Sequence, residues 1–164
     1  LYDAEHRILD ALPAMMEEAT NDDLKKAFEE HIEQTKKHVE RLDDIFEMLD
    51  EKPKRHTCEG IKGLIEEGEA MISMITVPEV MDTALIAAAQ KVEHYEISGY
   101  GTARAFAKMM DHDEAADLLQ ETLEEESETD ELLTEIAEST VNPIAMEEAS
   151  GMEMEDEAET RVEM

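Results

Sequence analysis

The stretch KVEHYEISGYG, residues 91–101, places acidic side chains on an apolar helical face. Glu93 and Glu96 share that face with apolar residues that recur at helical spacing, namely Leu85, Ile86, Ala89, Val92, Ile97 and Tyr100. A carboxylate turned toward a helical core is costly unless something pairs with it. The stretch therefore predicts a buried helix whose core contains a partner for two glutamates.

The same periodicity continues along the chain and predicts an all-α fold. Helices are expected at about 1–19, from the turn at 20–23 to about 49, at about 58–74, from Pro78 to about 110, and from the turn at 111–114 to about 139. Two antiparallel hairpins joined by a long crossover, which contains the short helix, form a ferritin-like four-helix bundle. Periodicity alone would equally allow another four-helix bundle.

The chain divides into a folded domain and an acidic tail. Residues 1–140 are expected to form the bundle, and residues 141–164 are Glu-rich and aperiodic, so we expect a disordered tail. The net charge is −31, and the tail contributes −7 of it, which leaves −24 on the bundle. Such a surface repels nucleic acid and anionic membranes, and it suits the salt-rich cytoplasm of a salt-loving microbe.

The remaining composition indicates a protein of the cytoplasm. The single cysteine, Cys58, excludes an intramolecular disulfide and fits a reducing compartment. No apolar run approaches the ~20 residues that a membrane-spanning helix requires.

Polar side chains lie on the predicted core face of every long helix. They are Glu5 on the first helix, His31, Thr35 and His38 with Gln34 at the edge on the second, Glu93 and Glu96 on the fourth, and Glu126 and Asp130 on the fifth. In an antiparallel hairpin, residues equally far from the turn lie at the same height. This rule brings Glu5 level with His38, and Glu93 level with Asp130.

Several acids that converge in an apolar core must be protonated, move apart or bind cations. Carboxylate oxygens and imidazole nitrogens are ligands for iron, manganese or zinc, so the pattern suggests a site for two metal ions. The alternative is that these are ordinary polar residues that are less buried than the periodicity indicates.

Five segments carry a family resemblance: LYDAEHRIL (1–9), FEEHIEQTKKHVERL (28–42), CEGIKGLIEEG (58–68), ALIAAAQKVEHYEISGYGT (84–102) and LLQETLEEESETD (118–130). They closely resemble the YciE/YciF family of ferritin-like proteins over residues 1–140. The resemblance implies a ferritin-like bundle, a homodimer, and a stress-associated, metal-binding protein with possible ferroxidase activity.

The resemblance also implies a di-metal site, with iron as the expected metal. The matching motifs contain Glu5, Glu93, Glu96, Glu126 and Asp130. Family members often have Glu at the position of Gln34 and Gln at that of His38, so we expect His38 as a further ligand, with Gln34 and His31 as weaker candidates. The fifth helix also lacks the His of a ferritin Glu-x-x-His motif.

Three functions are compatible with this pattern. The leading hypothesis is a di-iron protein that oxidises Fe(II) with dioxygen or peroxide, with Tyr100 as a possible redox-active neighbour and Tyr95 off the inner face. The second is a non-catalytic stress-associated bundle with a structural metal or none. The third is a manganese-dependent enzyme that removes peroxide.

Overall fold

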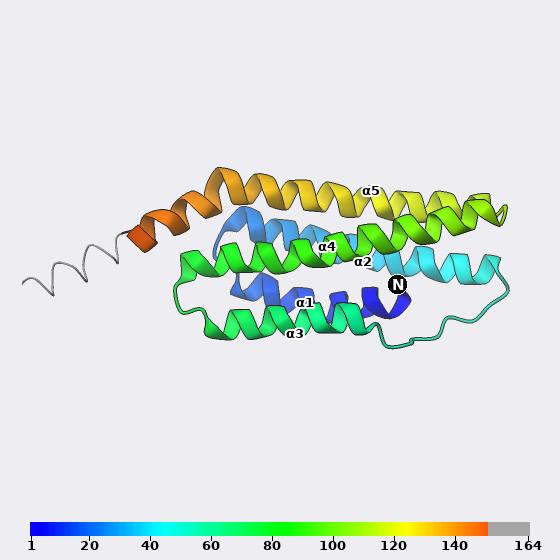
Figure 1. The fold of residues 1–164 in the computed structure, drawn as a ribbon, viewed down its shortest axis with the longest axis horizontal. Coiled ribbons are helices and arrows are strands. Elements are labelled where there is room, and N and C mark those ends of the chain that lie inside the picture. The colour runs from blue at the N-terminus through cyan, green and yellow to red at the C-terminus, as the bar shows by residue number, and fades with distance from the viewer. Residues whose placement is uncertain (151–164) are drawn as a thin grey trace, which may run out of the picture.

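The computed structural model describes residues 1–150, and within them it contains helices and no strand (Figure 1). The helices are α1 (Tyr2–Glu18), α2 (Asp22–Met48), α3 (Glu59–Met74), α4 (Pro78–Met109) and α5 (Asp113–Ile136), followed by the π-helix η1 (Ala137–Val141). The predicted boundaries agree with these to within one helical turn. None of the described helices combines the length and hydropathy that a membrane-spanning segment requires.

The bundle consists of two antiparallel hairpins. α1 packs against α2, and α4 packs against α5, while the connection between the hairpins runs back along the full length of the bundle (Figure 1). Within this connection α3 packs against α1 and α4, so α2 and α4 run in the same direction. This is the predicted ferritin-like bundle with one additional helix.

The long helices α2 and α4 end in the same way, at the same end of the bundle. Asp50 and Asp111 adopt the left-handed conformation, with φ of 53° and 60°, directly after the two C-caps. After α2, the N–H of Glu51 then donates to the carbonyl of Phe46 (2.9 Å), which is the Schellman arrangement that stops a helix.

Two buried aspartates, which the sequence analysis did not identify, hold the helices in place. Asp82 on α4 accepts hydrogen bonds from the N–H of Thr20 (2.7 Å) and of Asn21 (2.9 Å), in the turn between α1 and α2. Asp3 on α1 accepts the N–H of Cys58 (2.8 Å) at the start of α3, and this hydrogen bond holds the pKa of Asp3 well below its ordinary value. These contacts link the two hairpins and fix the crossover.

The helical region extends further than predicted. Residues 142–150 continue as α-helix, whereas the sequence suggested a disordered tail from residue 141. The wider turn of η1 places Val141, five residues after Ile136, back on the core face, and both side chains are buried. Pro143 directly follows Asn142 at the end of η1, and the helix continues through it. The rest of the predicted tail, residues 151–164, lies outside the described residues.

The excess charge predicts a stability that increases with salt. Residues 151–164 carry only −5 of the net charge of −31, so most of the self-repulsion arises within residues 1–150. Because the Debye length falls from about 10 Å at 0.1 M to about 3 Å at 1 M salt, we expect the melting temperature to rise by several degrees over this range. A chain truncated after residue 150 should show nearly the same rise. A melting temperature that does not change with salt would contradict this expectation.

Candidate metal centre

Six of the predicted site residues meet in the core of the bundle. Each of these residues is at most 2% exposed, and together they come from all four long helices. They are Glu5 on α1, His31 and His38 on α2, Glu93 and Glu96 on α4, and Glu126 on α5. The predicted core stripes therefore bring six of their polar members together.

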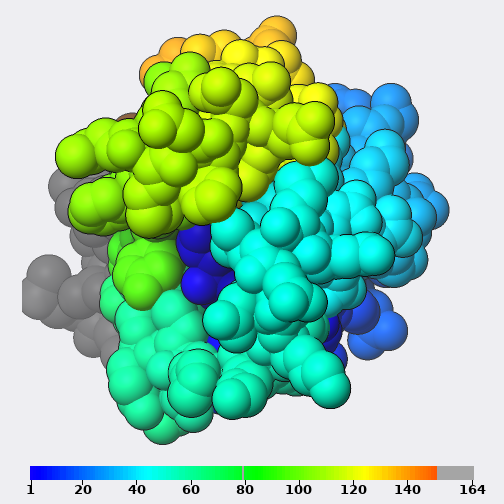
Figure 2. All heavy atoms as spheres, turned by 90° about the vertical axis from the view of Figure 1, so that its right-hand side faces the viewer, coloured from blue at the N-terminus to red at the C-terminus, as the bar shows by residue number. Residues whose placement is uncertain are grey.

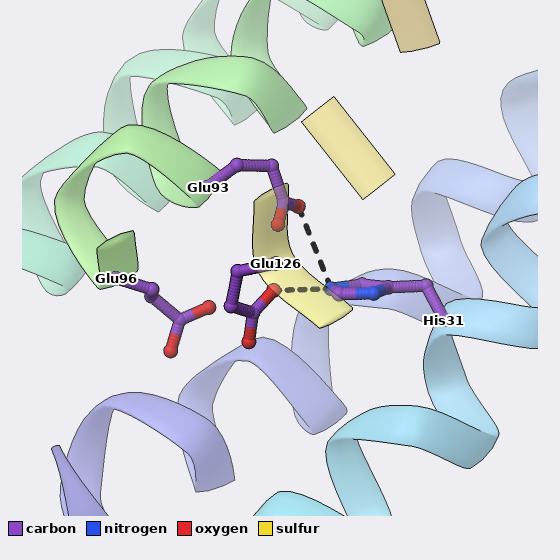
Figure 3. Close-up of side chains that lie close together, drawn as sticks. All are labelled: His31, Glu93, Glu96 and Glu126. Atoms are coloured by element: carbon purple, nitrogen blue, oxygen red, sulfur yellow. Dashed lines mark ion pairs between the residues drawn. The ribbon is translucent and has the colours of Figure 1, made fainter. Parts of the chain in front are cut away.

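The six residues form two groups that share one member. The first group comprises His31, Glu93, Glu96 and Glu126 (Figure 3), and the second comprises Glu5, His38 and Glu126. Within each group, one potential ligand atom from every residue lies within 4.8 Å of the others. The carboxylate of Glu126 points one oxygen at His31 Nε2 (3.8 Å) and the other at His38 Nδ1 (3.0 Å). Glu126 thus lies between the two groups, as a bridging carboxylate would.

The two ring nitrogens of His31 have different surroundings. Its Nε2 faces the first group and lies 3.4 Å from Glu93 Oε1. Its Nδ1 lies 3.3 Å from the amide oxygen of Gln34 and 3.3 Å from the hydroxyl of Thr129. Thr129 occupies the position that a Glu-x-x-His motif would give to histidine. Gln34 and Thr129 therefore orient His31 through the ring nitrogen that does not face the first group.

His38 is held by a glutamate that the sequence analysis missed. Its Nε2 lies 2.9 Å from Glu125 Oε2, and Arg41 pairs with the same carboxylate through both terminal nitrogens (2.5 and 3.0 Å). These contacts leave Nδ1 to face the second group. The only sequence signal for Glu125 was its position beside Glu126, on the flank of α5 that faces α2.

The structure leaves Asp130 outside both groups. Its carboxylate accepts a hydrogen bond from Gln90 Nε2 (3.0 Å) and lies 3.2 Å from Nε2 of the exposed His94. These partners are close neighbours of Glu93 on α4, so the predicted height was correct. The predicted direction of the Asp130 side chain was wrong. Asp130 lies four residues after Glu126, and over four residues a helix rotates by about 40° beyond a full turn.

Many of the buried polar atoms in the two groups form no hydrogen bond. Within residues 1–150, nine buried side-chain atoms have none, and only Arg104 Nε lies elsewhere. The others are Glu5 Oε2, His31 Nε2, His38 Nδ1, Glu93 Oε2, and both oxygens of Glu96 and of Glu126. Each such atom costs about 1–3 kcal/mol when it stays unsatisfied. Carboxylate oxygens and imidazole nitrogens in this arrangement fit iron, manganese or zinc.

Without a cation, protons must compensate the buried charges. Burial and the charge of Glu126 raise the pKa of Glu93 well above its ordinary value, and burial with the charges of Glu5 and Glu126 does the same for Glu96. Burial opposes a charge on His38, but Glu126 and Glu5 outweigh it and raise the pKa of His38 to about 10. Burial likewise opposes the ionisation of Glu126, yet contacts with His38 and Glu93 hold its pKa below the ordinary value.

These shifts predict that the metal-free protein becomes less stable as the pH rises. Glu93 and Glu96 keep protons in the folded state above pH 4.5, where the unfolded chain releases them. His38 behaves in the same way between pH 6.5 and about 10. The folded state therefore binds more protons, and we expect the free energy of unfolding to fall by more than about 1 kcal/mol between pH 5 and pH 9. Denaturant titrations at constant high salt measure this fall, and Glu93→Gln should show a smaller one. A free energy that increases with pH would refute the expectation.

Comparisons with known proteins agree with this fold. Residues 1–146 match the family model described as "Domain of unknown function (DUF892)". Protein YciF of Escherichia coli K12 is 44% identical over 149 residues, which cover 90% of each chain.

Solved structures extend the comparison. The crystal structure of the E. coli stress protein YciF matches with a TM-score of 0.82 and 45% identity, over 86% of this chain and 89% of that one. YcfI from Rhodopseudomonas palustris matches with a TM-score of 0.80 and 43% identity, over 81% and 85%. A protein from Xanthomonas campestris shares the fold, with a TM-score of 0.69 and 21% identity over 90% and 91%. The chain therefore belongs to the DUF892 family, together with the YciF proteins that its sequence motifs resemble.

Proposed function

We propose that this protein binds two divalent metal ions in the core of its bundle and, with iron, oxidises Fe(II) using dioxygen or peroxide. The observation that carries the proposal is the set of unpartnered buried atoms in two groups joined by Glu126. The charges support two ions. The four buried glutamates would carry four negative charges when ionised, which two divalent cations neutralise and one does not.

Each group supplies the donors for one ion. His31 Nε2 with Glu93, Glu96 and Glu126 would hold the first ion, and His38 Nδ1 with Glu5 and Glu126 would hold the second. Bound iron would supply the one-electron chemistry between the Fe(II) substrate and the oxidant.

The surrounding residues hold these donors in place. Glu125 engages Nε2 of His38 and so presents Nδ1 to the metal, while Gln34 and Thr129 present Nε2 of His31. Such supporting contacts are worth about 10–100-fold in metal affinity.

The surface of the bundle is hollowed at one end. Figure 2 views this end. A hollow lies between α4 and the end of α2, and the first turns of α1 are visible at its floor. Glu5 belongs to these first turns.

A non-catalytic metal site is the second candidate function. The site has fewer charged or basic donors than a full Glu-x-x-His pattern provides. Thr129 stands at the position of the motif histidine, and Gln34 beside His31 has a neutral amide. The same donors also suit manganese, so a peroxide-removing manganese enzyme belongs among the outcomes of the test.

The test is an anaerobic titration of the metal-free protein with Fe(II) at high salt, followed by exposure to dioxygen or to peroxide. We expect two ions per chain and an oxidation of Fe(II) much faster than in buffer. Two bound ions without faster oxidation would support the structural role. Peroxide removal by the manganese-loaded protein alone would support the manganese enzyme. The absence of stoichiometric binding of iron and manganese would refute the metal site.

A further inference from the structure

Tyr100 is a buried tyrosine that contacts the second donor group without belonging to it. Its side chain is 1% exposed, and its hydroxyl donates a hydrogen bond to Oε1 of Glu5. Its ring lies edge-on to that of His38, with 6.4 Å between the ring centroids. The second group consists of Glu5, His38 and the shared Glu126. Tyr100 therefore contacts both residues that belong to this group alone.

The other tyrosines lie elsewhere. Tyr95 is 39% exposed, and its hydroxyl lies 3.3 Å from Sγ of Cys58, at the start of α3. Tyr2 packs against His6 and Phe46. Of the three tyrosines in the chain, only Tyr100 has a phenol within hydrogen-bond contact of a residue in the two groups.

We propose that Tyr100 is an electron donor at this site. When only one Fe(II) is available, Tyr100 supplies one electron to peroxide. This inference rests on the proposed function. The reduction of hydrogen peroxide to two water molecules needs two electrons and two protons. A single Fe(II) supplies one electron, and without a second donor the cleaved O–O bond yields hydroxide and a hydroxyl radical.

With Tyr100 as the second donor the step is balanced. The O–O bond of peroxide breaks, one electron comes from Fe(II), which becomes Fe(III), and the other comes from Tyr100. The phenolic O–H bond breaks, and its proton passes to Glu5 along the existing hydrogen bond. This proton and one from solvent complete two water molecules, and a neutral tyrosyl radical remains on Tyr100.

The surroundings of Tyr100 suit this role. The ring packs in a cluster with the apolar side chains of Leu42, Ala116 and Leu119, so solvent and other reductants have little access to it. The proton acceptor is already in place, so the loss of the electron and of the proton needs no rearrangement. Tyr100 would thus retain the oxidising equivalent in the core in place of a diffusing hydroxyl radical.

The experiment compares the full-length wild type with Tyr100→Phe, which removes only the hydroxyl. Tyr95→Phe is the matched control, because it makes the same change at an exposed position of the same helix. Each metal-free protein receives one Fe(II) per chain without oxygen, then one equivalent of hydrogen peroxide. Samples are frozen for electron paramagnetic resonance, and parallel samples contain a spin trap for hydroxyl radical.

We expect a tyrosyl radical signal in the wild type and in Tyr95→Phe, and none in Tyr100→Phe. Tyr100→Phe should bind the same number of iron ions and release several-fold more trapped hydroxyl radical. If the wild type binds and oxidises iron but shows no tyrosyl radical, or if Tyr100→Phe retains the signal, this inference is wrong and the proposed function stands. If the wild type neither binds nor oxidises iron, the proposed function fails first.

Discussion

Glu126→Ala is expected to abolish the binding of both metal ions. Glu126 is the only residue common to the two donor groups, and each of its oxygens faces one of the two histidines. Because the loss of a supporting contact already costs about 10–100-fold in affinity, the loss of a ligand shared by both positions should cost more than about 100-fold at each. Glu5→Ala and Glu93→Ala remove donors from one group only. We expect each of these variants to weaken the binding of one ion far more than that of the other.

Calorimetric titration of the metal-free variants with Fe(II) or Mn(II) measures these affinities. The control is Glu128→Ala, because residue 128 is an exposed glutamate on the same helix. It should bind two ions as the wild type does, and circular dichroism should show that every variant remains helical. Retention of both ions by Glu126→Ala would show that the two groups do not form the site.

Metal binding should raise the melting temperature of the wild type by a large amount. A ligand present at 1,000 times its dissociation constant stabilises the folded state by about 4 kcal/mol per site. For a chain of this length each kcal/mol corresponds to about 2–4 °C. One saturated site should therefore add about 8–16 °C, and the second should add more. The physical source is the pairing of buried glutamates that otherwise repel one another or carry protons.

Melting curves at constant high salt, with and without metal, measure this increase. Glu126→Ala separates the site from the acidic surface, because it keeps the surface charge and loses the shared ligand. It should show little increase, whereas Glu128→Ala should match the wild type. An equal increase in all three proteins would indicate non-specific binding of cations to the surface.

Sequence periodicity was sufficient to predict the helices and most of the candidate site. A helical repeat fixes which side chains share a face, so the residues that lie inward on α1, α2, α4 and α5 can be identified without coordinates. The rule of equal distance from the turn then gave their heights, and Glu5 does lie beside His38 (3.6 Å). Local rules of this kind depend only on the backbone geometry of single helices and hairpins.

The side-chain contacts between helices, both within a hairpin and between the two hairpins, were decided by the tertiary structure. Nothing in the spacing of α5 shows that Asp130 turns toward Gln90, or that Glu125 engages His38 and Arg41, because these choices depend on how far each helix rotates against its neighbours. A rotation of about 40° separates a side chain in the core from one at the rim.

The helical residues after α5 and the buried aspartates show the same division between what the sequence predicts and what the tertiary structure decides. Val141 is buried only because the π-turn of η1 shifts the helical register, and Asp82 finds the turn between α1 and α2 only when the second hairpin packs on the first. The sequence by itself determined the helices, their inward faces and the gathering of buried acids. Only the tertiary structure decided the rotation of each helix, and with it which of those acids face one another, because that rotation results from packing contacts between residues far apart in the chain.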